Sequence, residues 1–363
     1  MTISLLKEEF LEKLNLASKF TSSRLVSASI LQGVYLVGEE NIIHVYSTNL
    51  NYYFHTSIKA PGKNKFNAAV EPKKLAEFLS LLPGGKIDIA VGEKNVEIES
   101  GKIKAEFPLL DAKEFPLPPK ITGSKQKIKA GFLRKNLPTV IFSASSDETR
   151  PALTGVNFVA DDEGLKMIST DGFRLSLLTL KKEESLPSMI IPAQFLNEVM
   201  RLITEDEIGF SYSPEEKTMV FYVGDCELYT RLIEGDYPPY EKVIPTDKKT
   251  TAAVDREEFL RNVKLVSIFA RDYSNVVVLN IEKGEVSIRP KTGDTEKNVV
   301  VSEAAVEGEP QKIAFNYKFL IDFLTNTTSK KIIIELLRSD APAVFKPDGV
   351  DNFIHIIMPV RIQ

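Results

Sequence analysis

Few residues in this sequence have the chemistry needed for catalysis or metal binding. The chain of 363 residues has three histidines, His44, His55 and His355, and one cysteine, Cys226. A structural zinc site takes about four ligands, usually cysteines and histidines at short spacings, and these residues are too few and too scattered. We therefore predict no metal site, and we expect each histidine to be an ordinary strand residue.

The run Ser143-Ala-Ser-Ser-Asp147 has the residue types of a nucleophilic site. A serine nucleophile needs a base within hydrogen-bond reach, and hydrolases often hold it in a Gly-x-Ser-x-Gly turn. No histidine is near this run in the sequence, and no such turn surrounds it. The sequence also lacks a Gly-x-x-x-x-Gly-Lys-Ser/Thr phosphate loop and a dinucleotide fingerprint. We expect a polar loop here, no cofactor and no enzymatic activity.

The composition is typical of a soluble globular protein. Hydrophobic residues make up 43% of the chain and charged residues 26%, and no apolar run approaches the roughly 18 residues that span a bilayer. The start, Met1-Thr-Ile-Ser-Leu, has no export leader, and Cys226 cannot form an internal disulfide. These features predict a cytoplasmic protein.

The formal net charge of −4 argues against bulk electrostatic binding to nucleic acid. The six helix-like runs described below carry a net +3 together, and the rest of the chain carries −7. A neutral-to-basic helical face on an acidic body would tolerate a polyanion on that face. The alternative is that the surface charges are scattered without a function.

Three similar stretches recur at intervals of about 120 residues. Each has two helix-like runs, and Phe10, Phe132 and Phe259 occupy matching places in the first run of each stretch. A repeat of this length predicts a domain with its own core rather than a solenoid unit. The six runs are residues 6–20, 70–83, 129–143, 191–203, 254–270 and 315–327.

Between the helix-like runs the apolar residues alternate, as in residues 86–91 and 331–336, which predicts antiparallel strands. The fold class is therefore α+β. Proline-marked segments at 107–116 and 231–238 predict strands that lead into linkers. We predict three domains, at residues 1–123, 124–248 and 249–363.

Three segments in this order complete the pattern: Thr170-Asp-Gly-Phe-Arg-Leu175, Glu234-Gly-Asp-Tyr-Pro-Pro-Tyr-Glu-Lys-Val-Ile-Pro245 and Ile356-Ile-Met-Pro-Val-Arg361. With the threefold repeat, they resemble the bacterial sliding clamp family, the beta subunit of DNA polymerase III. The resemblance covers the whole chain. It implies three clamp-type domains, each with antiparallel sheets outside and two helices inside, in a head-to-tail ring dimer.

The resemblance implies a non-catalytic processivity factor that encircles double-stranded DNA without reading its sequence. It also implies a groove for short Gln-Leu-x-Leu/Phe-like segments of the replicative polymerase, the clamp loader and repair polymerases. Phe173 stands where some members have histidine, so we expect a deeper apolar pocket and an altered peptide preference. The matching groove positions are Leu153, Thr170, Gly172, Phe173, Arg174, Leu175, Pro238, Val243, Met358, Pro359, Val360 and Arg361.

The resemblance also implies DNA-contacting and subunit-joining residues. Arg24 and Arg150 match family positions near DNA, but Pro151, Ala152, Ala193 and Gln194 replace aromatic or basic family residues. DNA contact is therefore expected to shift to other cations, and each of these cations could instead serve only in surface ion pairs. The shifted DNA contacts are Arg134, Lys135 and Arg201. The subunit joint is expected to place Lys102, Lys104 and Phe107 against Ile268 and Phe269, although the last two could instead be core helix residues.

The sequence leaves two other functions open. One is a triplicated scaffold that binds peptides but does not encircle DNA. The other is an enzyme with an unrecognised site, for which the sequence offers no nucleophile, metal or cofactor arrangement.

Overall fold

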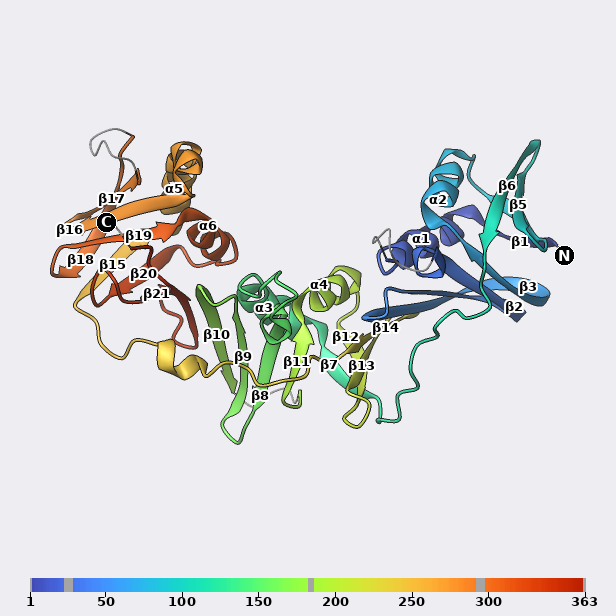
Figure 1. Ribbon diagram of the computed structural model, residues 1–363, viewed down its shortest axis with the longest axis horizontal. Helices are drawn as coiled ribbons and strands as arrows, with labels where there is room; N and C mark the ends of the chain where they lie inside the picture. Colours follow the sequence, from blue (N-terminus) through green and yellow to red (C-terminus); the bar gives the residue numbers. More distant parts are fainter. Residues whose placement is uncertain (1, 23–28, 182–185, 292–297, 362–363) are drawn as a thin grey trace. The chain divides into compact units, whose positions relative to one another are not determined.

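The computed structural model describes residues 2–22, 29–181, 186–291 and 298–361. The chain divides into two compact units. One unit comprises residues 1–131 and 198–232, and the other comprises residues 132–197 and 233–363. Each unit is built on one large antiparallel sheet with helices packed beside it (Figure 1).

The first unit has a ten-stranded sheet in the order β1-β4-β5-β6-β3-β14-β13-β12-β7, with β2 paired to β3. Helix α1 (Lys7–Ser18) contacts α2 (Pro72–Leu81) as well as β2 and β3. The strands are β1 (Thr2–Leu6), β2 (Val34–Thr48), β3 (Tyr52–Val70), β4 (Lys86–Val91), β5 (Asn95–Ser100), β6 (Ile103–Leu110), β7 (Gln126–Lys129), β12 (Glu207–Ser213), β13 (Thr218–Val223) and β14 (Cys226–Arg231).

The second unit has a twelve-stranded sheet in the order β11-β8-β9-β10-β22-β21-β20-β15-β18-β17-β16-β19. Helices α5 (Arg256–Ala270) and α6 (Tyr317–Thr325) pack on each other. Helices α3 (Ala130–Ile141) and α4 (Ala193–Leu202) each span a border between the two units. The strands are β8 (Gly155–Ala160), β9 (Gly164–Thr170), β10 (Arg174–Lys181), β11 (Met189–Pro192), β15 (Thr250–Asp255), β16 (Val276–Glu282), β17 (Glu285–Pro290), β18 (Val300–Gly308), β19 (Gln311–Asn316), β20 (Lys331–Leu336), β21 (Ala343–Pro347) and β22 (Phe353–Ile357).

Periodicity explains why these segments fold as they do. In α5 the buried residues Phe259, Val263, Val266 and Ala270 are three or four positions apart, so they share one helix face. In β20 every second residue is buried, as expected for a sheet with one covered face. All six helix-like runs of the sequence are helices, and the fold class α+β is confirmed.

The three repeats match in their hydrogen bonding. The first residue of α1, α3 and α5 donates its N–H to the carbonyl of Gly85, Asp206 and Lys330, at 2.9, 2.8 and 2.9 Å respectively. The fourth residues of these helices are therefore equivalent, and they are Phe10, Leu133 and Phe259, all buried. The prediction that Phe132 occupies this place was wrong by one residue, because the core position falls on Leu133 and Phe132 is only half-buried.

Strand pairing crosses both predicted domain borders. Strand β14 pairs with β3 from Glu227 opposite His55 to Thr230 opposite Tyr52, inside the first unit. Strand β10 pairs with β22 from Arg174 opposite Ile357 to Leu178 opposite Phe353, inside the second unit. Strands of neighbouring repeats thus share sheets, and the exact borders at 123/124 and 248/249 stay predictions. In the described part of the chain, no helix is both long and apolar enough to cross a bilayer.

Candidate functional site

A small apolar hollow of about 130 Å³ lies in the second unit, among the three sequence segments that carried the resemblance. Its walls come from the 3₁₀ turn η2 (Pro151–Thr154), the end of β9, the β9–β10 turn, the start of β10, the connector after residue 237 and the end of β22. Most of the predicted groove residues meet here, together with Pro239, Tyr240 and Ile356, which stand in the quoted segments but were not predicted as groove positions. The lining residues are Leu153, Thr170, Gly172, Arg174, Leu175, Pro238, Pro239, Tyr240, Val243, Ile356 and Met358.

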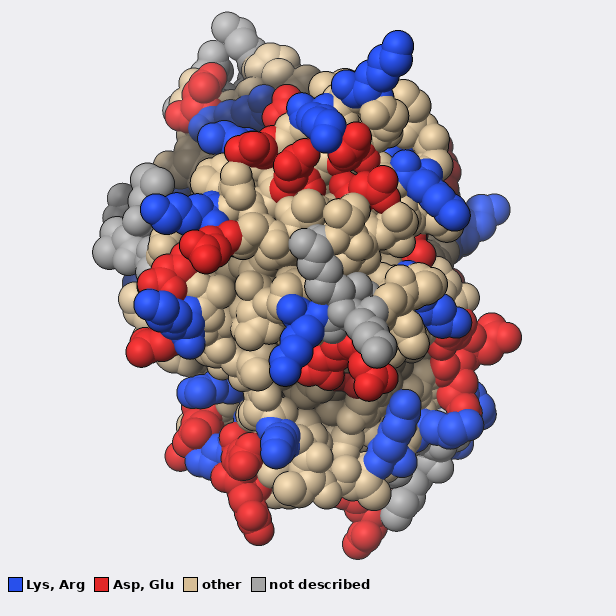
Figure 2. Space-filling view, turned by 90° about the vertical axis from the view of Figure 1, so that its right-hand side faces the viewer, with Lys and Arg blue, Asp and Glu red and all other residues tan. Residues whose placement is uncertain are grey.

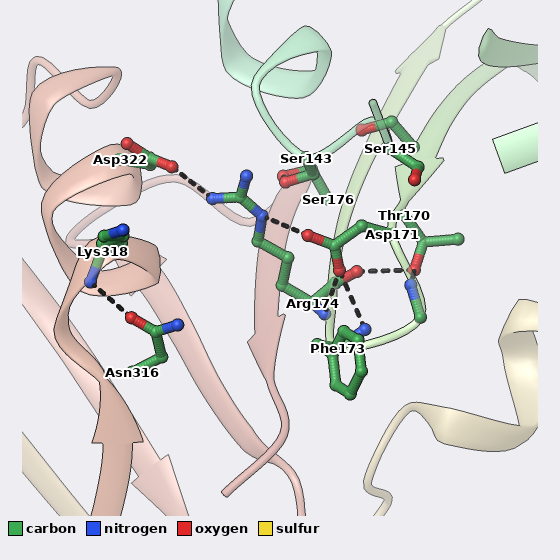
Figure 3. A network of polar contacts seen from close by, with 12 residues as sticks. Ser143, Ser145, Thr170, Asp171, Phe173, Arg174, Ser176, Asn316, Lys318 and Asp322 are labelled. Atoms are coloured by element: carbon green, nitrogen blue, oxygen red, sulfur yellow. Dashed lines mark hydrogen bonds and ion pairs between the residues drawn. The ribbon is translucent and has the colours of Figure 1, made fainter. Parts of the chain in front are cut away.

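The turn between β9 and β10 is held by its own side chains (Figure 3). Asp171 Oδ1 accepts hydrogen bonds from the backbone N–H groups of Phe173, at 2.8 Å, and Arg174, at 3.0 Å. Thr170 Oγ1 donates to the Arg174 carbonyl at 2.5 Å and accepts from the N–H of Gly172 at 3.0 Å. Gly172 has φ +93°, a backbone conformation that residues with a Cβ rarely adopt. The sequence Thr-Asp-Gly therefore specifies this turn.

The connector after Pro238 is anchored to the core beneath the hollow. A short 3₁₀ turn, η3 (Tyr240–Val243), places Tyr240 and Val243 in the wall. Tyr237 packs on a buried apolar cluster that includes Leu175 and Ile356, and its hydroxyl donates to the Ile168 carbonyl at 3.5 Å. Burial raises the pKa of the Tyr237 hydroxyl. An anchored aromatic residue next to Pro238 keeps this wall in place.

The C-terminal segment contributes Met358 to the lining of the hollow and is held at two points. The N–H of Met358 donates to the Phe173 carbonyl at 2.8 Å, and the N–H of Val360 donates to the Ala314 carbonyl at 2.8 Å. Val360 also packs against the buried cluster of β16 and β19. Its side chain therefore anchors the wall instead of lining the hollow. Of the predicted groove residues, those outside the lining are Phe173, Pro359, Val360 and Arg361.

Phe173 lies at the tip of the turn with its side chain 60% exposed. It does not line the hollow, so the structure does not show the deeper pocket that we expected from this phenylalanine. An exposed aromatic ring beside an apolar hollow provides additional apolar surface at its rim.

Arg174 has two carboxylate partners on different elements (Figure 3). Its Nε is 3.0 Å from Asp171 Oδ2, and its Nη1 is 2.5 Å from Asp322 Oδ2 on α6. The guanidinium also lies over the ring of Phe319, 4.7 Å from its centroid. The side chain is only 10% exposed. Arg174 therefore lines the hollow while its charged group is already bound within the protein.

A buried polar chain lies beneath this turn. Ser143 Oγ is 2.7 Å from Ser176 Oγ, which is 2.9 Å from His355 Nδ1. The pKa of His355 is held well below its usual range, mainly by burial and to a smaller extent by the charge of Arg174. The expected polar loop does begin after α3. The pairing of β22 with β10 brings His355 to Ser176 beside this loop, although His355 is far from the loop in the sequence. All three side chains are fully buried, so no substrate can reach them as a nucleophilic site.

The other histidines and the cysteine also have structural surroundings. His44 and His55 lie on the paired strands β2 and β3, and His55 Nδ1 is 2.9 Å from Glu227 Oε2. Burial raises the pKa of Cys226 to about 11. Within residues 2–22, 29–181, 186–291 and 298–361, no group of three or more His, Cys, Asp or Glu residues is arranged to hold a metal ion.

The predicted DNA-contacting residues occupy separate places. Arg134 and Lys135, both exposed on α3, line a larger hollow of about 910 Å³. Arg150 Nε is 3.3 Å from Asp147 Oδ2, and Arg201 Nη1 is 2.5 Å from Glu198 Oε1. Arg24 lies outside the described residues.

The predicted subunit-joining residues are on the surface. Ile268 and Phe269 are 59% and 44% exposed on α5, so the alternative that they are core residues does not hold. Phe107 on β6 is half-buried and meets Phe78 edge to face, with 5.4 Å between ring centroids. Lys104 pairs with Glu99 at 2.8 Å, and Lys102 is exposed.

Within the described part of the chain, strand β6 has a partly free edge. It pairs with β5 from Ile103 to Pro108, but its pairing with β3 is confined to Leu109 and Leu110. The free edge is a place where another chain can add a strand or pack its side chains.

On the face of the molecule in Figure 2, acidic and basic side chains are interspersed, and neither sign dominates.

Family models account for nearly the whole chain. They match the DNA polymerase III beta subunit N-terminal domain at residues 1–119, the central domain at 127–239 and the C-terminal domain at 241–361. The beta sliding clamp of Halalkalibacterium halodurans is 28% identical, with 98% of each chain covered.

The chain is also similar in structure to solved DNA polymerase III beta subunits. The DNA polymerase III beta subunit of Thermotoga maritima has a TM-score of 0.89 and 25% identity, covering all of both chains. A sliding clamp from Bartonella birtlesii, solved bound to griselimycin, has the same TM-score, identity and coverage.

The fold and these similarities define the class of three-domain sliding clamps, which are non-catalytic processivity factors in DNA replication. The chain belongs to the DNA polymerase III beta subunit family. Its function is that of a DNA sliding clamp.

Proposed function

We propose that the hollow between the β9–β10 turn, the 238–243 connector and Met358 is the docking site for short peptides of the replicative polymerase, the clamp loader and repair polymerases. Its volume of about 130 Å³ suits one or two apolar side chains of a peptide. The walls are aliphatic, proline and methionine residues, and methionine adapts to differently shaped partners. This convergence of three distant segments is the observation that carries the proposal.

The test is binding of a fluorescent Gln-Leu-x-Leu-Phe-type peptide, measured by anisotropy. The intact chain and a chain that ends at Met358 are compared, and a peptide with alanine in place of Gln and the first Leu is the control. We expect the intact chain to bind and the shortened chain to lose binding, because Val360 no longer anchors the wall. Absence of binding by the folded intact chain would contradict the proposed groove.

We propose that two chains join head to tail into a ring, with Lys102, Lys104 and Phe107 of one copy against Ile268 and Phe269 of the other. Exposed apolar side chains on α5 and the partly free edge of β6 support this joint, because both are surfaces that a partner would cover. Each chain would contribute three domains, with borders that we propose at 123/124 and 248/249. Limited proteolysis in these connectors would test the borders.

We propose that the ring encloses duplex DNA in the cytoplasm and that Arg24, Arg134, Lys135, Arg150 and Arg201 contact its phosphates. Contacts to phosphates hold DNA without reading its sequence. The test is retention of the loaded protein on closed circular DNA, compared with the same DNA after linearisation. Loss on linearisation supports a ring, whereas equal retention on both forms favours the peptide-binding scaffold.

A further inference from the structure

We infer that Asp322 on α6 is a positioning residue for the peptide groove and that it acts through Arg174. This inference rests on the proposed function of the groove. Asp322 is not among the residues that line the hollow. Its carboxylate nevertheless holds Arg174 Nη1 at 2.5 Å, and Arg174 is part of the wall (Figure 3).

The guanidinium of Arg174 is held by groups within the protein. Asp171 binds Nε, Asp322 binds Nη1, and Phe319 lies against the planar face of the group. Charge-assisted hydrogen bonds between a guanidinium and carboxylates fix the orientation of the planar guanidinium as well as its distance from the carboxylates. The part of Arg174 that remains to line the hollow is its hydrocarbon stem.

The orientation of this guanidinium is coupled to the turn between β9 and β10. Asp171, whose Oδ2 binds Arg174, uses Oδ1 to hold the N–H groups of Phe173 and Arg174. The carbonyl of Phe173 in turn accepts the N–H of Met358. One chain of hydrogen bonds thus runs from α6 through Arg174 and the turn to the C-terminal segment that carries Met358.

Asp322 can be changed without removing a core side chain. Its side chain is 43% exposed, and Asn326 bonds to its backbone carbonyl, not to its carboxylate. Asparagine has the same shape without the charge, so Asp322→Asn would weaken the link to Arg174 and leave the wall residues in place. Arg174 would keep its bond to Asp171, so a partial loss of affinity is expected.

The experiment measures peptide affinity and dissociation rate for the full chain with Asp322→Asn. Couplings of this kind change affinity by about two- to thirtyfold, and we expect the rise in Kd to fall within this range. Asp322→Glu, which restores the carboxylate, should recover much of the affinity. Asp340→Asn is the matched control, because Asp340 is an exposed carboxylate paired with Arg338 outside the hollow, and it should leave Kd unchanged.

A double-mutant cycle separates a positioning role from a general effect on stability. In a chain that carries Arg174→Gln, Asp322→Asn should have no further effect on Kd, because the group through which it acts is absent. The inference would be overturned if the Asp322→Asn chain bound the peptide as tightly as wild type. It would also be overturned if Asp322→Asn raised Kd by the same factor in the Arg174→Gln chain as in the wild-type chain. A wild-type chain that does not bind the peptide would instead remove the proposed groove function itself, and this inference with it.

Discussion

The rings of Phe323 and His355 stack in the interior of the second unit, with 5.1 Å between centroids and 6° between planes. His355 is fully buried, its Nδ1 is hydrogen-bonded to Ser176, and its Nε2 has no partner in the described part of the chain. The histidine is therefore held neutral beneath the groove, and this state has a consequence for stability at acid pH.

We predict that stability falls as the pH drops below about 6.5, the pKa of an unperturbed histidine. The folded state keeps the pKa of His355 well below that value, so the unfolded state takes up a proton that the folded state does not. The free energy of unfolding should fall by up to about 1.4 kcal/mol per pH unit for this proton. Urea unfolding between pH 7.5 and 5 measures the slope. His355→Asn should reduce it, and an unchanged slope in this variant would contradict the assignment.

Met358→Asp should raise the Kd of the peptide more than tenfold while the chain stays folded, because burying a carboxylate in an apolar hollow is costly. Peptide anisotropy and circular dichroism would be compared for the variant and wild type. Leu117→Asp is the control, since Leu117 is another exposed apolar residue and does not line the hollow. Global unfolding of the Met358 variant would show that this wall belongs to the core rather than to a surface groove.

Ile268→Asp with Phe269→Asp should convert the dimer into monomers of 40.6 kDa. Both side chains are exposed in the single chain, so charge at these positions leaves its core intact and disrupts only an apolar joint. Light scattering after gel filtration gives the mass. Ile42→Asp, at an exposed residue of β2, should leave the dimer unchanged. A double variant that stays dimeric would place the joint elsewhere.

Two phenylalanines should differ sharply in their effect on stability. Phe259→Ala should reduce the free energy of unfolding by about 3 to 5 kcal/mol, because this fully buried ring would leave a cavity. Phe173→Ala should change stability little, because its ring is exposed at the turn. Urea unfolding measures the first effect, and peptide anisotropy shows whether the exposed ring contributes to binding. Similar losses of stability in both variants would contradict the burial described for these rings.

Removing the cations of α3 should weaken DNA binding in a salt-dependent way. For Arg134→Gln with Lys135→Gln, the slope of log affinity against log salt should become shallower by about 0.9 for each phosphate that the variant no longer neutralises. The slope is measured on duplex DNA at several salt concentrations, and Lys283→Gln is the control, because Lys283 is an exposed lysine outside the proposed DNA contacts and the proposed subunit joint. An unchanged slope would leave Arg134 and Lys135 without a role in DNA binding.

The sequence by itself determined the repeated elements, because helical and strand periodicity are local properties. It also specified the turn at Asp171 and Gly172, whose bonds form within a few residues. At Phe132 the local pattern predicted the core position wrongly by one residue. Two neighbouring apolar residues are almost equivalent in a sequence pattern, and only packing decides that Leu133 is buried.

The tertiary structure alone decided which distant residues meet. The pairing of β10 with β22 brings His355 beside Ser176, and the packing of α6 brings Asp322 to Arg174, 148 positions away. Burial also separated residues of similar type within the predicted groove, since Met358 lines the hollow and Val360 anchors its wall. These relationships depend on strand register and side-chain packing over long separations, which a local pattern does not encode.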